Sequence, residues 1–496
     1  APASGWPELL ARARTRARAL GRPVLATWVE PAPEDVEPMD VLARATGAED
    51  RIYWSHPEAG LAYAAVGAAV HVAPSGAGRR FASAARLWGA LRADMVRGAA
   101  EGVPDQVVAA MPMLAGGFSF DPLRPATPLW LGFPDAWLAV PELALRVDRD
   151  GRWLVSSAFV RPGDEPVLVA DRTLRERASI LGRGGEDERA DAWALIASAF
   201  RPRAEGRAPA TIEPLVDPAR WRERVARAAA AVQGGEMEKV VLARAVRRRA
   251  AAAPELPSLL RRLEAEYRAC RVFAIVRGRR TFVGATPERL VALERGVVRA
   301  TALAGSVRRG ATPDEDARLA ASLMASAKDR LEHDIVVRAL REGLAELADD
   351  VRAPDGPETV TMANVHHLHT PLTARPRTGV GLLDLVARLH PTPAVGGVPR
   401  EAALAWLRAH EELDRGWYAA PIGWIGADGD GEFAVALRSA LLDGATATLF
   451  AGCGVMGDSD PESELAESEL KLRPMMQALD GEDATARGGD AREGDA

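Results

Sequence analysis

The chain has 496 residues, of which 48% are hydrophobic and 27% are charged, and its formal net charge is −6. These values are typical of an ordinary soluble globular protein and exclude intrinsic disorder for most of the chain. The longest apolar stretches are broken well before the roughly 18 to 20 residues that a membrane span needs, so we expect no membrane span.

The basic residues are unusual in kind. Of the 63 lysines and arginines only three are lysine, namely Lys239, Lys328 and Lys471, although lysine is ordinarily among the commonest residues. Each position that keeps an amine is therefore a candidate for chemistry that arginine cannot perform. The arginines are interleaved with 69 acidic residues and their clusters are short, so we expect a solvated surface and no nucleic-acid partner.

Two cysteines, Cys270 and Cys453, are too few for a disulfide framework or a cysteine-based zinc site. Such sparse cysteine is typical of a reducing compartment, and we expect a cytoplasmic protein. The N-terminal segment is rich in arginine, but it carries Glu8 and lacks the apolar run of a signal peptide.

The first 180 residues have the pattern of mixed α/β structure. Leucines at helical spacing, followed by Gly21 and Pro23, predict an N-terminal surface helix that ends there. Short β-rich runs then alternate with amphipathic segments. We expect strands at 24–29, 51–54, 61–66 and 69–73 and a helix at 81–96.

Linker-like composition at 183–189 and 201–216 places the main boundary near residue 205. This predicts an N-terminal α/β region over 1–205 that packs with a second region over 206–479. The remaining segment, 480–496, holds six acidic residues and two arginines without aromatics, and we expect a disordered acidic tail. With this tail removed, the folded part is nearly neutral.

The second region is predicted to combine a many-stranded sheet structure with outer helices. Asp217 and Pro218 form a helix start, and apolar residues then recur at helical spacing until Gly234 and Gly235. Further helices are expected near 256–268, 313–346, 398–410 and 461–478. Strands are expected at 239–244, 272–276, 281–285, 297–303, 360–368, 419–425, 433–440 and 446–455.

Two predicted helices each carry carboxylates three residues apart, and such residues share a helix face. These are Asp329 with Glu332 and Glu464 with Glu467, the latter followed by Lys471. The two pairs could converge on a hard dication such as Mg²⁺, which takes oxygen ligands. Alternatively, acidic residues in a first helical turn complement the helix dipole, and Glu467 with Lys471 forms a surface pair.

Two further residues are candidates for proton transfer. Lys239 opens an apolar strand, where desolvation would lower its pKa and make it a plausible general base; a lysine reaching from a strand end to water is the alternative. Arginine cannot fill the role of base because its guanidinium does not lose a proton in proteins. Glu288 follows a strand end, where most carboxylates are merely surface residues.

Several segments are suited to binding an anion. Gly452 lies at a strand end and Gly305 with Ser306 is similar, so bare backbone N–H groups could approach a carboxylate. Tyr418 and Arg438 lie on neighbouring segments and could grip a carboxylate. Of the histidines at 366, 367 and 369 at most two share a strand face, which favours structural roles over a zinc site.

Together these segments resemble the chorismate-utilising enzymes. Eight stretches occur in the order expected of that family over about residues 215–478. They are EKVVLAR (238–244), GATPERLV (284–291), ALAGS (302–306), KDRLEHDIV (328–336), HPTPAVGG (390–397), DRGWYAAPIGW (414–424), FAVALRSA (433–440) and AGCGVMGDSDPESELAESELK (451–471).

The resemblance implies an α/β (α+β) fold, a large sandwich of two mostly antiparallel sheets with helices packed outside, in which 206–479 is the chorismate-binding catalytic domain. It implies a Mg²⁺-dependent enzyme without a nucleotide or redox cofactor. Lys239 would be the base that activates water for attack on ring carbon two, and Glu288 the acid that protonates the departing hydroxyl at carbon four. The implied Mg²⁺ ligands are Glu332 and Glu467, with Asp329 and Glu464 acting through water. The implied substrate-binding residues are Gly305, Ser306, His367, Tyr418, Arg438, Gly452 and Lys471.

Within the family, the segment MPMLAGGFSFDP (111–122) and the length resemble isochorismate synthases of menaquinone biosynthesis. The alternatives are a salicylate synthase, which adds pyruvate elimination, and a siderophore-pathway isochorismate synthase. Ala304 replaces the lysine of lysine-dependent aminodeoxychorismate synthases. No tryptophan-binding LLES-like segment of anthranilate synthases is found, so we expect no glutaminase partner, and a monomer or weak dimer. An inactive chorismate binder would be expected to have lost Lys239 or Glu288.

Overall fold

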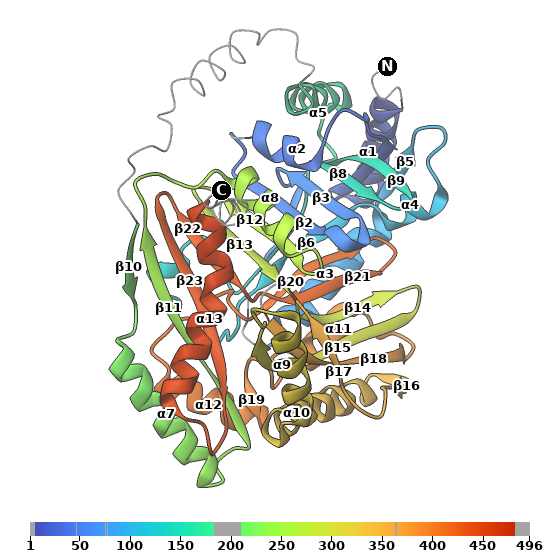
Figure 1. Ribbon diagram of the computed structural model, residues 1–496. Helices are drawn as coiled ribbons and strands as arrows, with labels where there is room; N and C mark the ends of the chain where they lie inside the picture. The colour runs from blue at the N-terminus through green and yellow to red at the C-terminus, as the bar shows by residue number, and fades with distance from the viewer. Residues whose placement is uncertain are drawn as a thin grey trace.

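The computed structural model describes residues 5–45, 47–74, 76, 78–182, 210–362 and 365–481. Two large sheets, largely antiparallel, form the centre of the molecule and helices cover their outer faces (Figure 1). This is the predicted fold class. No helix in these ranges is both long and apolar enough to cross a bilayer.

The first sheet has 13 strands, and each region of the chain supplies one continuous half of it. Only the edge pair β1–β5 is parallel among the strand pairs within the described ranges. From that edge the N-terminal half runs β5 (Val96–Ala99), β1 (Val24–Pro31), β9 (Gly151–Val160), β8 (Leu143–Asp148), β3 (Leu61–Val66) and β2 (Asp50–His56). The other half continues β12 (Arg271–Arg277), β13 (Arg280–Thr286), β22 (Ser439–Asp443), β23 (Thr446–Val455), β11 (Lys239–Arg249) and β10 (Thr211–Pro214), with β19 (Gly397–Val398) beside β11.

The second sheet has ten strands and is likewise shared between the two regions, which meet at the pair β20–β6. Its order is β16 (Ala348–Arg352), β18 (Val365–Pro376), β15 (Val297–Arg308), β14 (Arg289–Glu294), β21 (Gly431–Val435), β20 (Pro421–Gly426), β6 (Met113–Phe118), β7 (Ala136–Val140) and β4 (Val70–Val72), with β17 (Glu358–Thr361) beside β18. In the first sheet the corresponding junction is β12–β2.

The helices bury one apolar face each against these sheets. In α1 the apolar face includes Trp6, Leu9 and Leu10, all at most 1% exposed, and the helix ends at Gly21 with a positive φ of 65°. The helices are α1 (Trp6–Leu20), α2 (Pro38–Arg44), α3 (Arg80–Asp94), α4 (Asp105–Ala110), α5 (Pro166–Ile180), α7 (Pro218–Gln233), α8 (Leu256–Glu266), α9 (Pro313–Ala325), α10 (Ala327–Ala345), α11 (Leu382–Leu389), α12 (Arg400–His410) and α13 (Pro461–Asp480).

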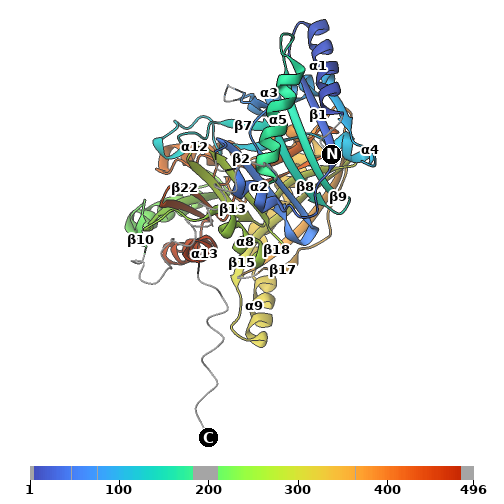
Figure 2. The same ribbon diagram turned by 90° about the horizontal axis from the view of Figure 1, so that it is seen from above.

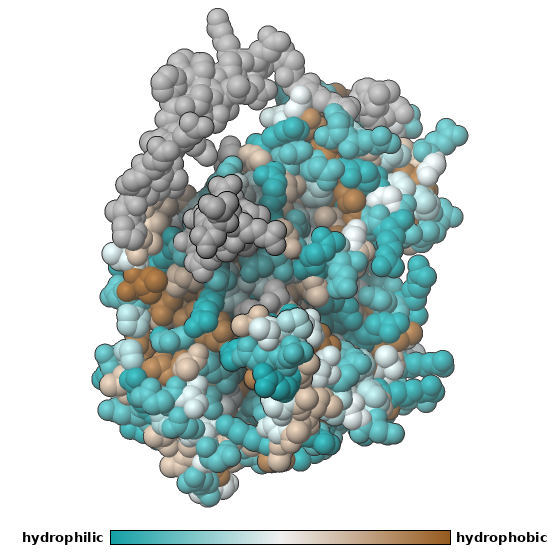
Figure 3. Space-filling view, in the orientation of Figure 1, coloured by the Kyte–Doolittle hydropathy of each residue, from teal (hydrophilic) through white to brown (hydrophobic). Residues whose placement is uncertain are grey.

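Seen from above, α1 and α5 lie at one end of the molecule and α9 at the other (Figure 2). The face in Figure 3 is mostly hydrophilic, and hydrophobic residues gather on its left side, beside β10 and β11. The solvated surface expected from composition agrees with this view.

The chain crosses between the two sheets at two short links that lie side by side. The link from β13 to β14 consists of Pro287 and Glu288, and residues 436–438 link β21 to β22. Strand β13 pairs with β22 in the first sheet and β14 pairs with β21 in the second. The Val435 N–H donates to the Glu288 carbonyl at 3.0 Å, which holds the two links together.

Three element predictions were wrong in detail. The helix expected over 313–346 is divided into α9 and α10, because Ser326 has an extended backbone and its side chain accepts from the Asp329 N–H, which starts a new helix. The strand expected over 360–368 is divided between β17 and β18, and that expected over 433–440 is divided between β21 and β22, which belong to different sheets. The boundary near residue 205 and nearly all of the acidic tail lie outside the described residues, and the division into two regions stays a prediction.

Candidate active site

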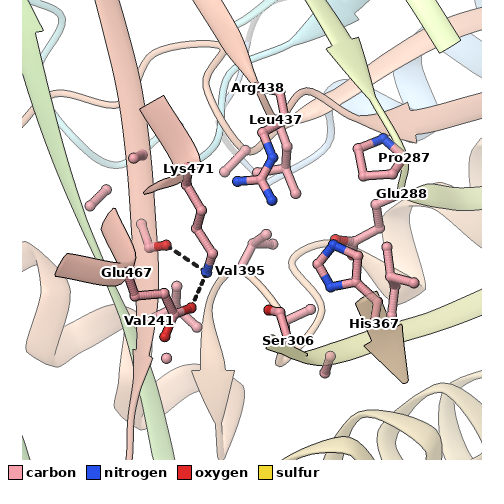
Figure 4. A pocket seen from close by; sticks show the side chains of 18 of the residues that line it. Val241, Pro287, Glu288, Ser306, His367, Val395, Leu437, Arg438, Glu467 and Lys471 are labelled. Atoms are coloured by element: carbon pink, nitrogen blue, oxygen red, sulfur yellow. Dashed lines mark hydrogen bonds and ion pairs between the residues drawn. The ribbon is translucent and has the colours of Figure 1, made fainter. Parts of the chain in front are cut away.

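A pocket lies between the two sheets and is lined by residues of both. Strands β11, β15, β18 and β23, helices α10 and α13, and both links contribute to its lining. Figure 4 shows Arg438, Lys471 and His367 around one common space. Of the residues to which the sequence assigned a role, eleven line this pocket: Glu288, Gly305, Ser306, Asp329, Glu332, His367, Tyr418, Arg438, Gly452, Glu467 and Lys471.

Lys239 is fully buried and lies behind the pocket lining. Its Nζ donates to Glu332 Oε1 at 2.8 Å. A Cβ on Gly454 would lie 2.8 Å from Lys239 Cε and 2.9 Å from Glu332 Oε1, so only glycine leaves room for this pair. Burial alone would raise the pKa of Glu332, but the attraction of Lys239 holds it below its usual value.

The second lysine is tied to the second carboxylate pair. Lys471 Nζ lies 2.5 Å from Glu467 Oε1 and donates to the Gly452 carbonyl at 3.0 Å (Figure 4). Burial disfavours the ammonium, yet the charge of Glu467 leaves the pKa of Lys471 above its usual value. The i, i+4 pair of Glu467 and Lys471, which the sequence offered as a surface pair, therefore exists. It lines a pocket, however.

The negative charges of the other two carboxylates, Glu464 and Asp329, are less well balanced by neighbouring positive charge. Glu464 is 3% exposed, its Oε1 lies 3.9 Å from Lys328 Nζ, and its Oε2 has no hydrogen-bond partner. Burial, followed by repulsion from Glu467, raises the pKa of Glu464. Burial and, less strongly, the neighbouring Glu332 likewise raise the pKa of Asp329. Two carboxyl groups held with raised pKa values beside a pocket are suited to a cation.

The residues fit Mg²⁺ in donor chemistry, because all four are carboxylates. They are not gathered as ligands, however: among the described residues no group of three or more His, Cys, Asp or Glu side chains could hold a metal ion. Three of the four carboxylates instead face a lysine: Glu332 with Lys239, Glu467 with Lys471, and Glu464 with Lys328.

Glu288 is only 4% exposed because it sits in the link between the sheets. Burial raises its pKa to about 7, although the positive charges of Lys239, Lys471 and Arg438 act in the opposite direction. The carboxyl group is thus half protonated near neutral pH, which is the condition a general acid requires.

Arg438 lies in the other link, with a positive φ of 49°. Burial lowers its pKa, and it forms no ion pair with any described residue. Tyr418 lines the pocket, is 4% exposed and stacks on Phe450 with ring centroids 5.2 Å apart. An unpaired guanidinium beside a phenol is suited to a carboxylate.

The opposite wall is formed by a β-bulge. The β15–β18 register shifts between Ala304 and Ser306, and the extra residue, Gly305, has a φ of 74°. The Gly305 carbonyl lies 3.4 Å from His367 Nδ1, while His367 Nε2 is buried without a partner. Burial, with Arg438 and Lys471, lowers the pKa of His367 to about 3, so the ring is neutral and its free nitrogen can accept a hydrogen bond.

The sequence analysis gave no role to Arg415 and Val395, which also line the pocket. Both lie in motifs that signalled the family, but motif membership does not reveal which side chains face inward. Arg415 is already neutralised, since its Nε and Nη2 donate to Glu411 at 2.6 and 2.7 Å. The positive charge of Arg415 is therefore balanced by Glu411 within the protein.

The chorismate binding enzyme family matches residues 10–480 of the chain. The chain belongs to this family. The expected resemblance is thereby confirmed.

Other members of the chorismate binding enzymes are similar over nearly the whole chain. The salicylate biosynthesis isochorismate synthase of Pseudomonas aeruginosa is 39% identical over 472 residues, covering 94% of this chain and 93% of that protein. The isochorismate synthase MenF of Bacillus subtilis is 35% identical over 434 residues, covering 87% and 88%. The solved structure of the menaquinone-specific isochorismate synthase MenF of Escherichia coli has a TM-score of 0.72 at 22% identity. It covers 95% of this chain and all of that one, which supports the fold.

Proposed function

We propose that the protein is a Mg²⁺-dependent isochorismate synthase, which converts chorismate to isochorismate. The observation that carries the proposal is Glu288, a buried carboxyl group with a pKa of about 7 that faces the same pocket as the unpaired Arg438. Similar proteins named isochorismate synthases support the choice of reaction.

The reaction moves a hydroxyl group between ring carbons. Water adds at carbon two and the double bonds shift, while the hydroxyl at carbon four leaves as water after Glu288 protonates it, because hydroxide is a poor leaving group. Lys239 takes the proton from the attacking water, and this proton returns to Glu288 through solvent after turnover. Lys239 is bound to Glu332, so a base role requires Lys239 to leave this pair.

Chorismate carries two carboxylates, one on the enolpyruvyl group and one on the ring, and each is assigned to a different set of pocket residues. Arg438, Tyr418 and Lys471 bind the enolpyruvyl carboxylate, while the neutral His367 and the Gly305–Ser306 bulge border the ring. The residues that would hold Mg²⁺ are Glu332 and Glu467, with Asp329 and Glu464 through water. When bound, the ion neutralises the ring carboxylate and fixes its orientation.

The pathway is a separate matter from the reaction. One similar protein is named for salicylate biosynthesis and another, MenF, has a menaquinone-specific counterpart among the solved structures. We propose a menaquinone role on the resemblance of residues 111–122.

The test is to incubate the protein with chorismate and Mg²⁺ and to separate the products by chromatography. We expect isochorismate without pyruvate. Stoichiometric pyruvate with salicylate would assign a salicylate synthase, and anthranilate formed with ammonia would assign an anthranilate synthase. Glu332→Gln should weaken the Mg²⁺ dependence of the rate; an unchanged metal titration would argue against the carboxylate set.

A further inference from the structure

A buried cluster of two arginines and one glutamate lies beside the link that carries Glu288. Arg271 on β12 and Arg289 on β14 both donate through Nε to the same oxygen, Glu432 Oε1 on β21, at 2.8 and 2.7 Å. The side chains of Arg271 and Glu432 are each 8% exposed and that of Arg289 is 23% exposed.

The cluster spans both sheets and flanks Glu288 on both sides in the chain. Arg289 is the next residue after Glu288, and Arg271 pairs with Thr286, two residues before it. Strand β12 belongs to the first sheet, whereas β14 and β21 belong to the second. Glu432 therefore ties β14, which begins after the link, to β12, the neighbour of the strand that ends before the link.

Backbone contacts at the link converge on the same strand, β21. The Thr286 hydroxyl donates to the Val435 carbonyl at 2.6 Å, and the Val435 N–H donates to the Glu288 carbonyl at 3.0 Å. These bonds hold the link against β21, and the cluster holds Arg289, the residue that follows Glu288.

A buried cluster of charges is weak evidence for a stabilising role. Removing charges from water costs several kcal/mol per ion, and buried ion pairs can often be replaced by apolar side chains without loss of stability. The cluster also carries a net positive charge, and burial together with Arg271 lowers the pKa of the neighbouring His56 to about 4. Such an arrangement is retained more readily for geometry than for stability.

We propose that Glu432 is a positioning residue, which holds Arg271 and Arg289 across the two sheets and thereby fixes the Glu288 carboxyl group toward the substrate. The inference rests on the proposed function, in which Glu288 is the general acid. Misplacement of a reacting group by about 1 Å can cost on the order of a hundredfold in rate.

The first measurement is the kinetics of Glu432→Gln, which keeps the shape of the side chain but removes the charge that both arginines bind. We expect kcat to fall by roughly 10- to 100-fold while KM for chorismate changes by less than about threefold, because Glu432 does not touch the pocket. The matched control is Glu30→Gln, which removes another buried carboxylate that binds an arginine, Arg177, between β1 and α5. We expect this control to keep the wild-type kcat.

The decisive measurement is the double variant Glu288→Gln/Glu432→Gln. If Glu432 acts through Glu288, the factor lost on changing Glu432 should shrink to near one in the Glu288→Gln background. The same factor in both backgrounds would overturn the inference. If Glu288→Gln alone keeps the full rate, it is instead the assignment of Glu288 that fails.

If Glu432→Gln does not fold, Arg289→Met replaces it, since Arg289 is the most exposed member and its loss leaves the Arg271–Glu432 pair intact. The expected result is the same: a lower kcat, little change in KM, and no further loss in the Glu288→Gln background. A loss of rate that persists there would again overturn the inference.

Discussion

The protonation of Glu288 gives the sharpest test of the proposed chemistry. Burial moves its pKa from an ordinary value of 4.5 to about 7. At pH 7 about half of the enzyme then carries the protonated acid, whereas a carboxyl group of pKa 4.5 would be protonated in only about one molecule in 300. The rate should therefore fall about tenfold for each pH unit above about 7.

The perturbation is Glu288→Gln, which keeps the size of the side chain and removes its proton. We expect kcat to fall by roughly 10²- to 10⁴-fold, the usual contribution of general acid–base catalysis, and the alkaline limb of the pH profile to disappear. The assay is the initial rate of isochorismate formation from pH 5.5 to 9. A variant that retains the wild-type alkaline limb would refute the assignment, because another group would then be responsible for it.

The same pKa predicts a stability change with a definite sign. The folded state holds the proton more tightly than the unfolded chain, so this stabilising contribution is complete below about pH 4.5 and is lost as pH rises through about 7. The difference corresponds to about 3 kcal/mol. Chemical denaturation of wild type and Glu288→Gln at several pH values measures it: the free energy of unfolding of the wild type should decline relative to the variant across this window. Parallel curves would mean that burial does not perturb Glu288.

Three other variants test the rest of the pocket. Gly454→Ala places a Cβ 2.8 Å from Lys239 Cε and should lower kcat by on the order of a hundredfold; an unchanged rate would show that the Lys239–Glu332 pair is dispensable. Lys239→Arg should abolish nearly all turnover while calorimetry still detects chorismate binding, whereas a near-normal rate would remove Lys239 as the base. Arg438→Lys should raise KM by roughly 10- to 100-fold through loss of a charge-assisted hydrogen bond, and an unchanged KM would place the carboxylate elsewhere.

The sequence selected eleven residues that line the pocket but missed others, and it did not describe their electrostatics. Glu288 was recognisable from its motif, yet on its own it resembled a surface residue at a strand end; its burial arises because β13 and β14 belong to different sheets. The motif containing Arg438 was expected to be one continuous strand over 433–440, although it is divided between β21 and β22. A segment that crosses from one sheet to the other can have the same apolar residue pattern as a strand within one sheet, so the sequence does not reveal the crossing.

The lysines illustrate the same limit. Their scarcity marked Lys239, Lys328 and Lys471 as notable, and i, i+4 spacing predicted the pair of Lys471 with Glu467. The pairs of Lys239 with Glu332 and of Lys328 with Glu464 join residues far apart in the chain, so no local spacing could predict them. Glu432 gave no signal at all, because a single carboxylate at the edge of an apolar strand is most often a surface residue.

The sharing of both sheets between the two regions has a consequence for biosynthesis. The N-terminal strands β2 and β6 are completed only by β12 and β20, so during synthesis each presents an unpaired edge while the second region is still being made. Because chains emerge N-terminus first, this interval lasts until residue 277 has emerged for β2 and residue 426 for β6. Chaperone binding to the nascent chain is therefore expected to concentrate on these two edges.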